Sequence, residues 1–75
     1  MHVFLQRLCD AFGAGAEVCD VSVMRLAEVL QCKDHEVRTV LSGLHVHKMI
    51  AERPIVQHHS VVRLVLPSAA DVDRR

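Results

Sequence analysis

The six histidines of this 75-residue chain are the side chains best suited to metal binding or proton transfer. His45 and His47 lie two positions apart in a helical pattern, where side chains two apart point about 200° from each other, so the pair cannot hold one ion. His58 and His59 are adjacent, and adjacent side chains of a strand face opposite sides. A shared site would need the first pair to meet the second pair in space. The spacing therefore predicts no metal site and no cofactor.

Three cysteines, Cys9, Cys19 and Cys32, are the candidate nucleophiles. They are odd in number and contain no C-x-x-C unit, so they cannot all pair within the chain. Unpaired cysteines commonly pack as small hydrophobic side chains, and their use indicates a reducing compartment. A cysteine nucleophile would also need a pocket shared with a histidine, which a domain of this size rarely has. We therefore expect an intracellular protein of the cytoplasm, nucleus or an organelle matrix, not a secreted one, with no enzymatic activity and no small-molecule substrate.

Positive charge is unevenly distributed along a chain whose formal net charge is zero. Residues 1–32 carry two basic and four acidic residues, a net of −2, whereas residues 33–63 carry five basic and three acidic residues, a net of +2. Five of the six histidines also lie in residues 33–63, and histidine gains charge below about pH 6.5. Lys33, Arg38, Arg53 and Arg63 are the fixed charges that we expect to contact phosphates. Such binding should tighten between about pH 7.5 and 6.

Hydrophobic spacing predicts three helices that would position these groups. Phe4, Leu8 and Phe12 form one stripe, which Gly13 and Gly15 end. A second helix follows an N-cap at Ser22 or Asp20, and a third begins near Lys33 or Asp34. Their buried stripes are Val23, Leu26, Ala27 and Leu30 in the second helix, and Val37, Val40, Leu41 and Leu44 in the third. The connection at residues 31–33 is too short for side-by-side antiparallel packing and predicts a sharp corner. A core of Leu8, Leu26, Leu41, Leu44 and Leu64 is expected.

The remaining segments predict strands. Residues 17–21 form one short extended piece, and residues 49–53 and 60–66 form a hairpin with a long tip. In the last strand, alternation places Val62, Leu64 and Leu66 on the helices and Val61, Arg63 and Val65 outside. Residues 1–66 would form the domain and residues 67–75 a flexible tail. No apolar run approaches the ~18 residues of a membrane span, so no membrane partner is expected.

This order of elements resembles the winged helix-turn-helix superfamily over about residues 4–66. Within it, residues 21–53 are similar to the helix-turn-helix core: S-x-x-x-L-A-x-x-L for the second helix and E-V-x-x-V-L-x-x-L for the third. The resemblance implies an α+β fold with three helices, a short first strand and a C-terminal two-stranded wing. The compact layout is also similar to Z-nucleic-acid-binding domains. Their Asn and Tyr positions fall on Arg38 and Ser42, and their Trp position falls near Val62, so those signature residues are absent.

Two functions are compatible with this layout. The first is a nucleic-acid-binding module for DNA or RNA, belonging to a larger protein or complex. Its candidate contact residues are Lys33, His35, Arg38, Ser42, His45, Arg53, His58, His59 and Arg63. The alternative is a protein-protein interaction domain that binds no nucleic acid. Zero net charge and a third helix poor in arginine favour this alternative, with Val46, Val61 and Val65 as the docking residues.

Overall fold

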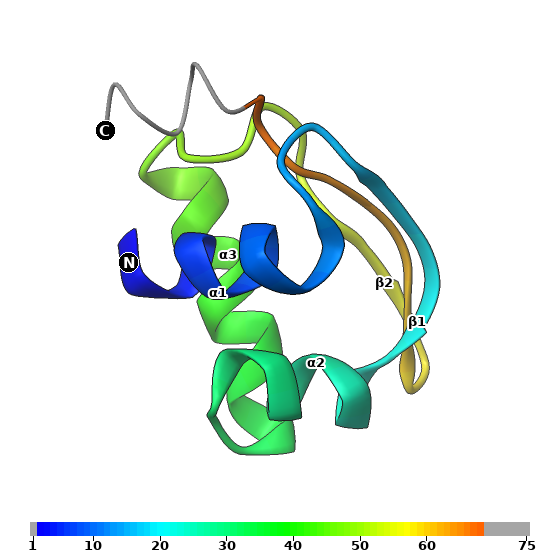
Figure 1. Ribbon diagram of the computed structural model, residues 1–75. Coiled ribbons are helices and arrows are strands. Elements are labelled where there is room, and N and C mark those ends of the chain that lie inside the picture. The colour runs from blue at the N-terminus through cyan, green and yellow to red at the C-terminus, as the bar shows by residue number, and fades with distance from the viewer. Residues whose placement is uncertain (1, 69–75) are drawn as a thin grey trace.

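The protein folds as three α-helices beside one small antiparallel sheet, which confirms the α+β class (Figure 1). The computed structural model describes residues 2–68. Along the chain the elements are α1 (His2–Phe12), β1 (Glu17–Ser22), α2 (Val23–Leu30), a 3-10 turn η1 (Asp34–Glu36), α3 (Val37–Val46), β2 (Ile55–Gln57) and β3 (Ser60–Val65). In this part of the chain, no helix has the length and apolar character needed to cross a membrane.

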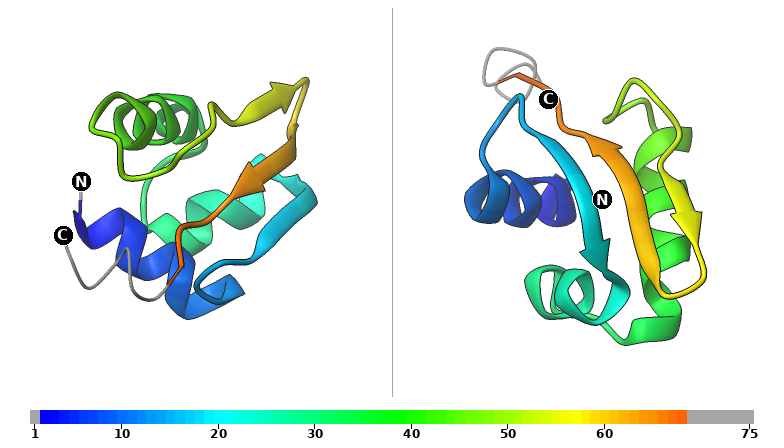
Figure 2. Two further views of the ribbon diagram at one scale, coloured as in Figure 1. Left: turned by 90° about the horizontal axis from the view of Figure 1, so that it is seen from above. Right: turned by 90° about the vertical axis from the view of Figure 1, so that its right-hand side faces the viewer.

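The helices lie on one side of the sheet (Figures 1 and 2). Their buried side chains form one hydrophobic core with those of the sheet. Fourteen hydrophobic residues are buried in residues 2–68, and no polar or charged residue is buried there. The expected core is confirmed, since five leucines are at most 1% exposed: Leu8, Leu26, Leu41, Leu44 and Leu64. Phe4, Cys9 and Phe12 of α1 pack against its edge.

The ends of α1 and α2 follow from their capping residues. Gly13, with φ of 99°, stops α1 as expected, and its N–H bonds the carbonyl of Cys9 at 2.8 Å. At the start of α2 the hydroxyl of Ser22 accepts a hydrogen bond from the N–H of Arg25 at 3.1 Å, so Ser22 is the N-cap rather than Asp20. At the other end Gln31 adopts φ 57° and ψ 46°, a left-handed conformation that turns the chain sharply towards η1.

The first strand of the hairpin differs from the expectation. Residues 49–52 form bends rather than a strand, and the strand is Ile55–Gln57. The cause lies at the end of α3, where the N–H of Met49 bonds the carbonyl of Leu44 at 2.9 Å and Lys48 has φ of 58°. This hydrogen bond and the left-handed conformation of Lys48 end the helix and turn the chain before a strand can begin. The side chain of Ile50, which is 1% exposed, then packs in the core.

The hairpin tip is also shorter than expected. Gln57 pairs directly with Ser60, so the turn consists of His58 and His59 alone. His58 has φ of 54°, which a two-residue turn requires at its first position. The sheet order is β1-β3-β2, with β3 in the centre and both neighbours antiparallel to it.

The expected outward position of Val61 is wrong. Val61 is fully buried, whereas Val62, expected to face the helices, is only half-buried. Ile55 pairs with Arg63 and Val56 with Val61, so Val62 is an extra residue in β3 opposite β2. Such a bulge interrupts the alternation of side chains by one position. From Arg63 onward the alternation is as expected, with Leu64 and Leu66 buried.

The chain leaves the sheet alongside the loop that follows α1. The N–H of Leu66 bonds the carbonyl of Ala16 at 2.9 Å, and the N–H of Gly15 bonds that of Pro67 at 2.7 Å. Pro67, the first residue of the expected tail, is therefore joined by a backbone hydrogen bond to the loop after α1. The rest of the expected tail, residues 69–75, lies outside the described residues.

Candidate nucleic-acid interface

Two neighbouring depressions lie where α3 approaches the β2–β3 hairpin, and Arg38 borders both. Figure 2 shows α3 and β2 running beside each other on this side of the molecule. The first, which we call the α3–β2 groove, has a volume of about 380 Å³ and is lined by Arg38, Leu41, Ser42, Arg53, Pro54, Ile55 and Val56. The second, the hairpin-tip pocket, is lined by Val23, Asp34, His35, Arg38, His58 and His59.

The structure thus brings together six of the nine candidate nucleic-acid contacts. Arg38 and Ser42 come from successive turns of α3, which places them on one side of that helix. Arg53 comes from the loop before β2 and faces the same groove. The other three are the imidazoles of the hairpin-tip pocket, His35, His58 and His59.

Most arginines of the described chain are already engaged, and the exceptions border the groove. Arg7 donates to the carbonyl of Leu30 at 2.8 Å, and Arg25 lies 3.7 Å from the Glu28 carboxylate. Arg38 and Arg53 make no hydrogen bond or ion pair within residues 2–68. Their guanidinium groups are exposed and are available to an external anion.

Arg63 lies apart from this pair. Its Nε donates to the Glu17 carboxylate at 3.0 Å, and its Nη1 pairs with the Glu52 carboxylate. The hydrogen bond to Glu17 and the charge of Glu52 raise the pKa of Arg63 above its ordinary value. The group is therefore charged but locally neutralised by two carboxylates, and it lines neither depression.

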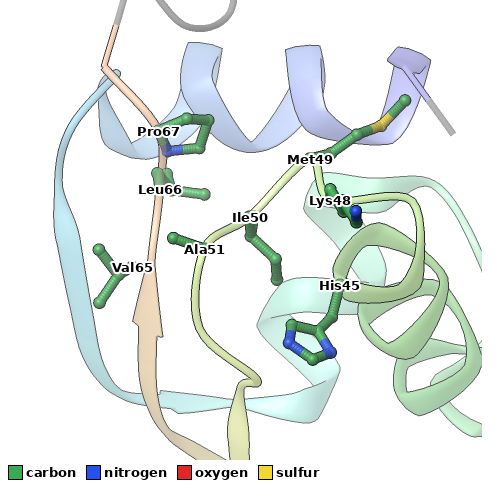
Figure 3. Close-up of a pocket in the computed structure, with 8 residues that line it drawn as sticks. All are labelled: His45, Lys48, Met49, Ile50, Ala51, Val65, Leu66 and Pro67. Atoms are coloured by element: carbon green, nitrogen blue, oxygen red, sulfur yellow. The ribbon is translucent and has the colours of Figure 1, made fainter.

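Lys33 and His45 also lie outside the two depressions. Lys33 is exposed at the start of η1, where its backbone N–H donates to the Glu36 carboxylate at 3.1 Å. His45 is half-buried near the far end of α3. There it borders a separate pocket formed with the 48–51 loop and the end of β3 (Figure 3).

The three valines expected to form a protein-docking face do not share one surface. Val61 is buried in the core, and Val65 borders the pocket of Figure 3. Val46, by contrast, is 73% exposed at the end of α3. Only Val46 is therefore fully available to a partner.

The three cysteine thiols are free. Burial, followed by the negative charge of Asp10, raises the pKa of Cys9. Burial, followed by the charges of Glu36 and Asp34, raises the pKa of Cys32. A raised pKa keeps the thiol protonated at neutral pH. Within residues 2–68, no group of three or more His, Cys, Asp or Glu residues is arranged to hold a metal ion.

Sequence reasoning missed the apolar floor of the groove and one acidic neighbour. Leu41, Pro54 and Ile55 line the groove, and Asp34 lines the hairpin-tip pocket. Asp34 lies four positions before Arg38, a spacing that places two side chains on one side of a helix and could have indicated a shared site. The position of Ile55 depended on where β2 begins, for which the sequence carried no clear signal.

Comparisons with models of protein families, with curated proteins and with solved structures give no match.

Proposed function

We propose that this chain is a nucleic-acid-binding module with a winged-helix arrangement, in which α2 and α3 form the helix-turn-helix and the β2–β3 hairpin is the wing. The observation that carries the proposal is the position of Arg38 and Arg53. They are the arginines without an internal partner in residues 2–68, and both line the α3–β2 groove. Arginine binds phosphate in a bidentate, charge-assisted manner, so two free guanidinium groups in one groove suit a nucleic-acid backbone.

The same face supports recognition of the backbone rather than of base sequence. α3 carries one arginine, Arg38, and bidentate arginine contacts are the commonest specific readers of guanine. The chain has no Trp or Tyr, and both phenylalanines lie on α1, half-buried against the core. Stacking of unpaired bases on aromatic side chains therefore has no platform at this groove. We infer weak sequence preference and an affinity that falls as salt rises.

The test compares two double variants of equal charge change. Arg38→Ala with Arg53→Ala removes the two free guanidinium groups, and Arg25→Ala with Arg63→Ala removes two that already face carboxylates. Fluorescence polarisation with short DNA and RNA duplexes and single strands would measure Kd at several salt concentrations. The first variant should bind every sequence more weakly and flatten the slope of log K against log salt by about one to two units.

The control variant should retain most of the affinity and slope of the unmodified chain. Circular dichroism would verify that both variants are folded. Equal losses in the two variants would contradict the assignment of the groove. Failure of the unmodified chain to bind any of these nucleic acids at about 50 mM salt would overturn the proposed function.

A protein-binding role is the second candidate, and the exposure of Val46 favours it. Val46 is 73% exposed at the end of α3, and Ile55, which lines the α3–β2 groove, is 47% exposed, so both offer apolar contacts to a partner. This role becomes the leading one if nucleic-acid binding fails. The free cysteines suit a reducing, intracellular compartment under either role.

A further inference from the structure

We propose that the hairpin-tip pocket is a second phosphate site, one that binds a backbone phosphate of the nucleic acid only as its histidines take up protons. This inference rests on the proposed function and identifies what one part of the interface does. The α3–β2 groove would supply affinity at neutral pH, and the hairpin-tip pocket would add affinity on acidification.

Three separate elements supply the polar side chains of this pocket. η1 contributes Asp34 and His35, α3 contributes Arg38, and the hairpin tip contributes His58 and His59. The N–H of Val23, at the start of α2, donates to the carbonyl of His59 at 2.8 Å and fixes the tip against the helices. The histidines and Arg38 are all exposed, so an external phosphate can reach them without any rearrangement.

The charge of the pocket depends on its imidazoles. Arg38 contributes +1 and Asp34 contributes −1, which leaves a net charge of zero while the three histidines are neutral. Full protonation of the histidines takes the net charge to +3. Histidine is the type of side chain that most readily gains charge on mild acidification, so protonation would turn the pocket from neutral to cationic. α2 adds only the apolar Val23 to this lining.

The adjoining groove has no such dependence. Its charged residues are Arg38 and Arg53, and neither a carboxylate nor a histidine lines it. Arginine remains protonated at every accessible pH. The two depressions therefore separate a constant contribution to phosphate binding from a proton-dependent one, and Arg38 belongs to both.

The experiment compares two triple variants that remove equal numbers of histidines. The first is His35→Gln, His58→Asn and His59→Gln, with Asn at position 58 because Asn tolerates the positive φ found there. The matched control is His2→Gln, His45→Gln and His47→Gln, whose positions lie outside the pocket. Kd for one short duplex would be measured at pH 7.5 and 6.0 at constant ionic strength, on the whole chain.

Uptake of about one proton per complex changes Kd about tenfold per pH unit, by linkage. The unmodified chain and the control should therefore bind about 5- to 30-fold tighter at pH 6.0 than at pH 7.5. The pocket variant should show less than a twofold change in Kd between the two pH values. Calorimetry in two buffers of different ionisation enthalpy would count the protons taken up directly.

The failures of the two proposals are distinguishable. A chain that binds the duplex with the same Kd at both pH values overturns the proton-dependent site and leaves the proposed function intact. The same follows if the pocket variant keeps the full pH response, or if the control loses it. Absence of duplex binding at either pH overturns the proposed function itself.

Asp34→Asn provides an independent test, because it removes the carboxylate that balances Arg38. We expect this variant to bind the duplex several-fold tighter at pH 7.5, since the pocket then carries a net positive charge with neutral histidines. Glu28→Gln is the control, since Glu28 lies on α2 and pairs with Arg25 outside the pocket. An equal gain from both substitutions would contradict a local role for Asp34.

Discussion

Arg63 shows how carboxylates can neutralise a cationic side chain without burying it. It pairs with Glu17 and Glu52, which neutralise it locally, although its side chain is 42% exposed. Glu17 lies 46 residues away in the sequence. Charge patterns along the chain therefore grouped Arg63 with Arg38 and Arg53, whereas the structure separates them. Which cations are free was not predictable from sequence, because it depends on pairings between distant strands and loops.

Leu41 is a core residue whose substitution we expect to lower the stability of the domain. It is 1% exposed on α3 and also forms part of the floor of the α3–β2 groove. Leu41→Ala should destabilise the fold by about 2 to 5 kcal/mol, since it removes buried methyl groups and leaves a cavity. Urea denaturation would measure the change. Thr39→Ala, at an exposed site on the same helix, is the control, and a loss for Leu41→Ala below about 1 kcal/mol would contradict its packing.

At the scale of elements, the helices and the second strand of the hairpin were predictable, whereas the first hairpin strand and the tip were not. Each helix has apolar residues on one side at helical spacing, so Leu8, Leu26 and Leu44 marked the core correctly. The hairpin contains a bulge at Val62 and begins after a loop closed by backbone hydrogen bonds. Neither feature alters the hydrophobic pattern in a recognisable way, since non-glycine residues occupy the left-handed positions at Lys48 and His58.

The corner between α2 and η1 carries a correctable backbone strain. Gln31 is exposed and adopts φ of 57°, a region that costs non-glycine residues about 1–2 kcal/mol. Gln31→Gly should stabilise the domain by about 0.5–1 kcal/mol, because glycine adopts this conformation without a Cβ penalty. The greater conformational entropy of glycine in the unfolded chain offsets part of this gain. Thermal and urea unfolding would measure this change in stability. Gln31→Ala should leave stability within about 0.5 kcal/mol, and destabilisation by Gly would refute the strain argument.

At the scale of the whole molecule, the formal net charge is zero, but the charged side chains are unevenly distributed over the surface. Free arginines and histidines gather where α3 meets the hairpin, whereas Arg63 and its two carboxylates lie outside that face. The fold produces this division by placing β3 between β1 and β2, so that residues far apart in sequence become neighbours. The net charges of residues 1–32 and 33–63 have opposite signs, which indicated an uneven charge distribution. Only the three-dimensional arrangement shows on which surface each charged residue lies.

The hydrogen bond from Val23 to His59 has a thermodynamic consequence for recognition. It joins the tip of the hairpin to the first residue of α2, so the two sides of the interface are held in register before any ligand arrives. For the proposed binding to nucleic acid, we therefore expect a small loss of conformational entropy at the hairpin tip. Val23→Pro removes the donor while suiting the first position of a helix, whereas Val23→Ala keeps the donor. Amide hydrogen exchange at Gln57 and Ser60 should be faster in the proline variant than in the alanine variant, and its duplex binding should carry a larger entropic penalty in calorimetry. Equal exchange rates in the two variants would show that the tip is held by the sheet alone.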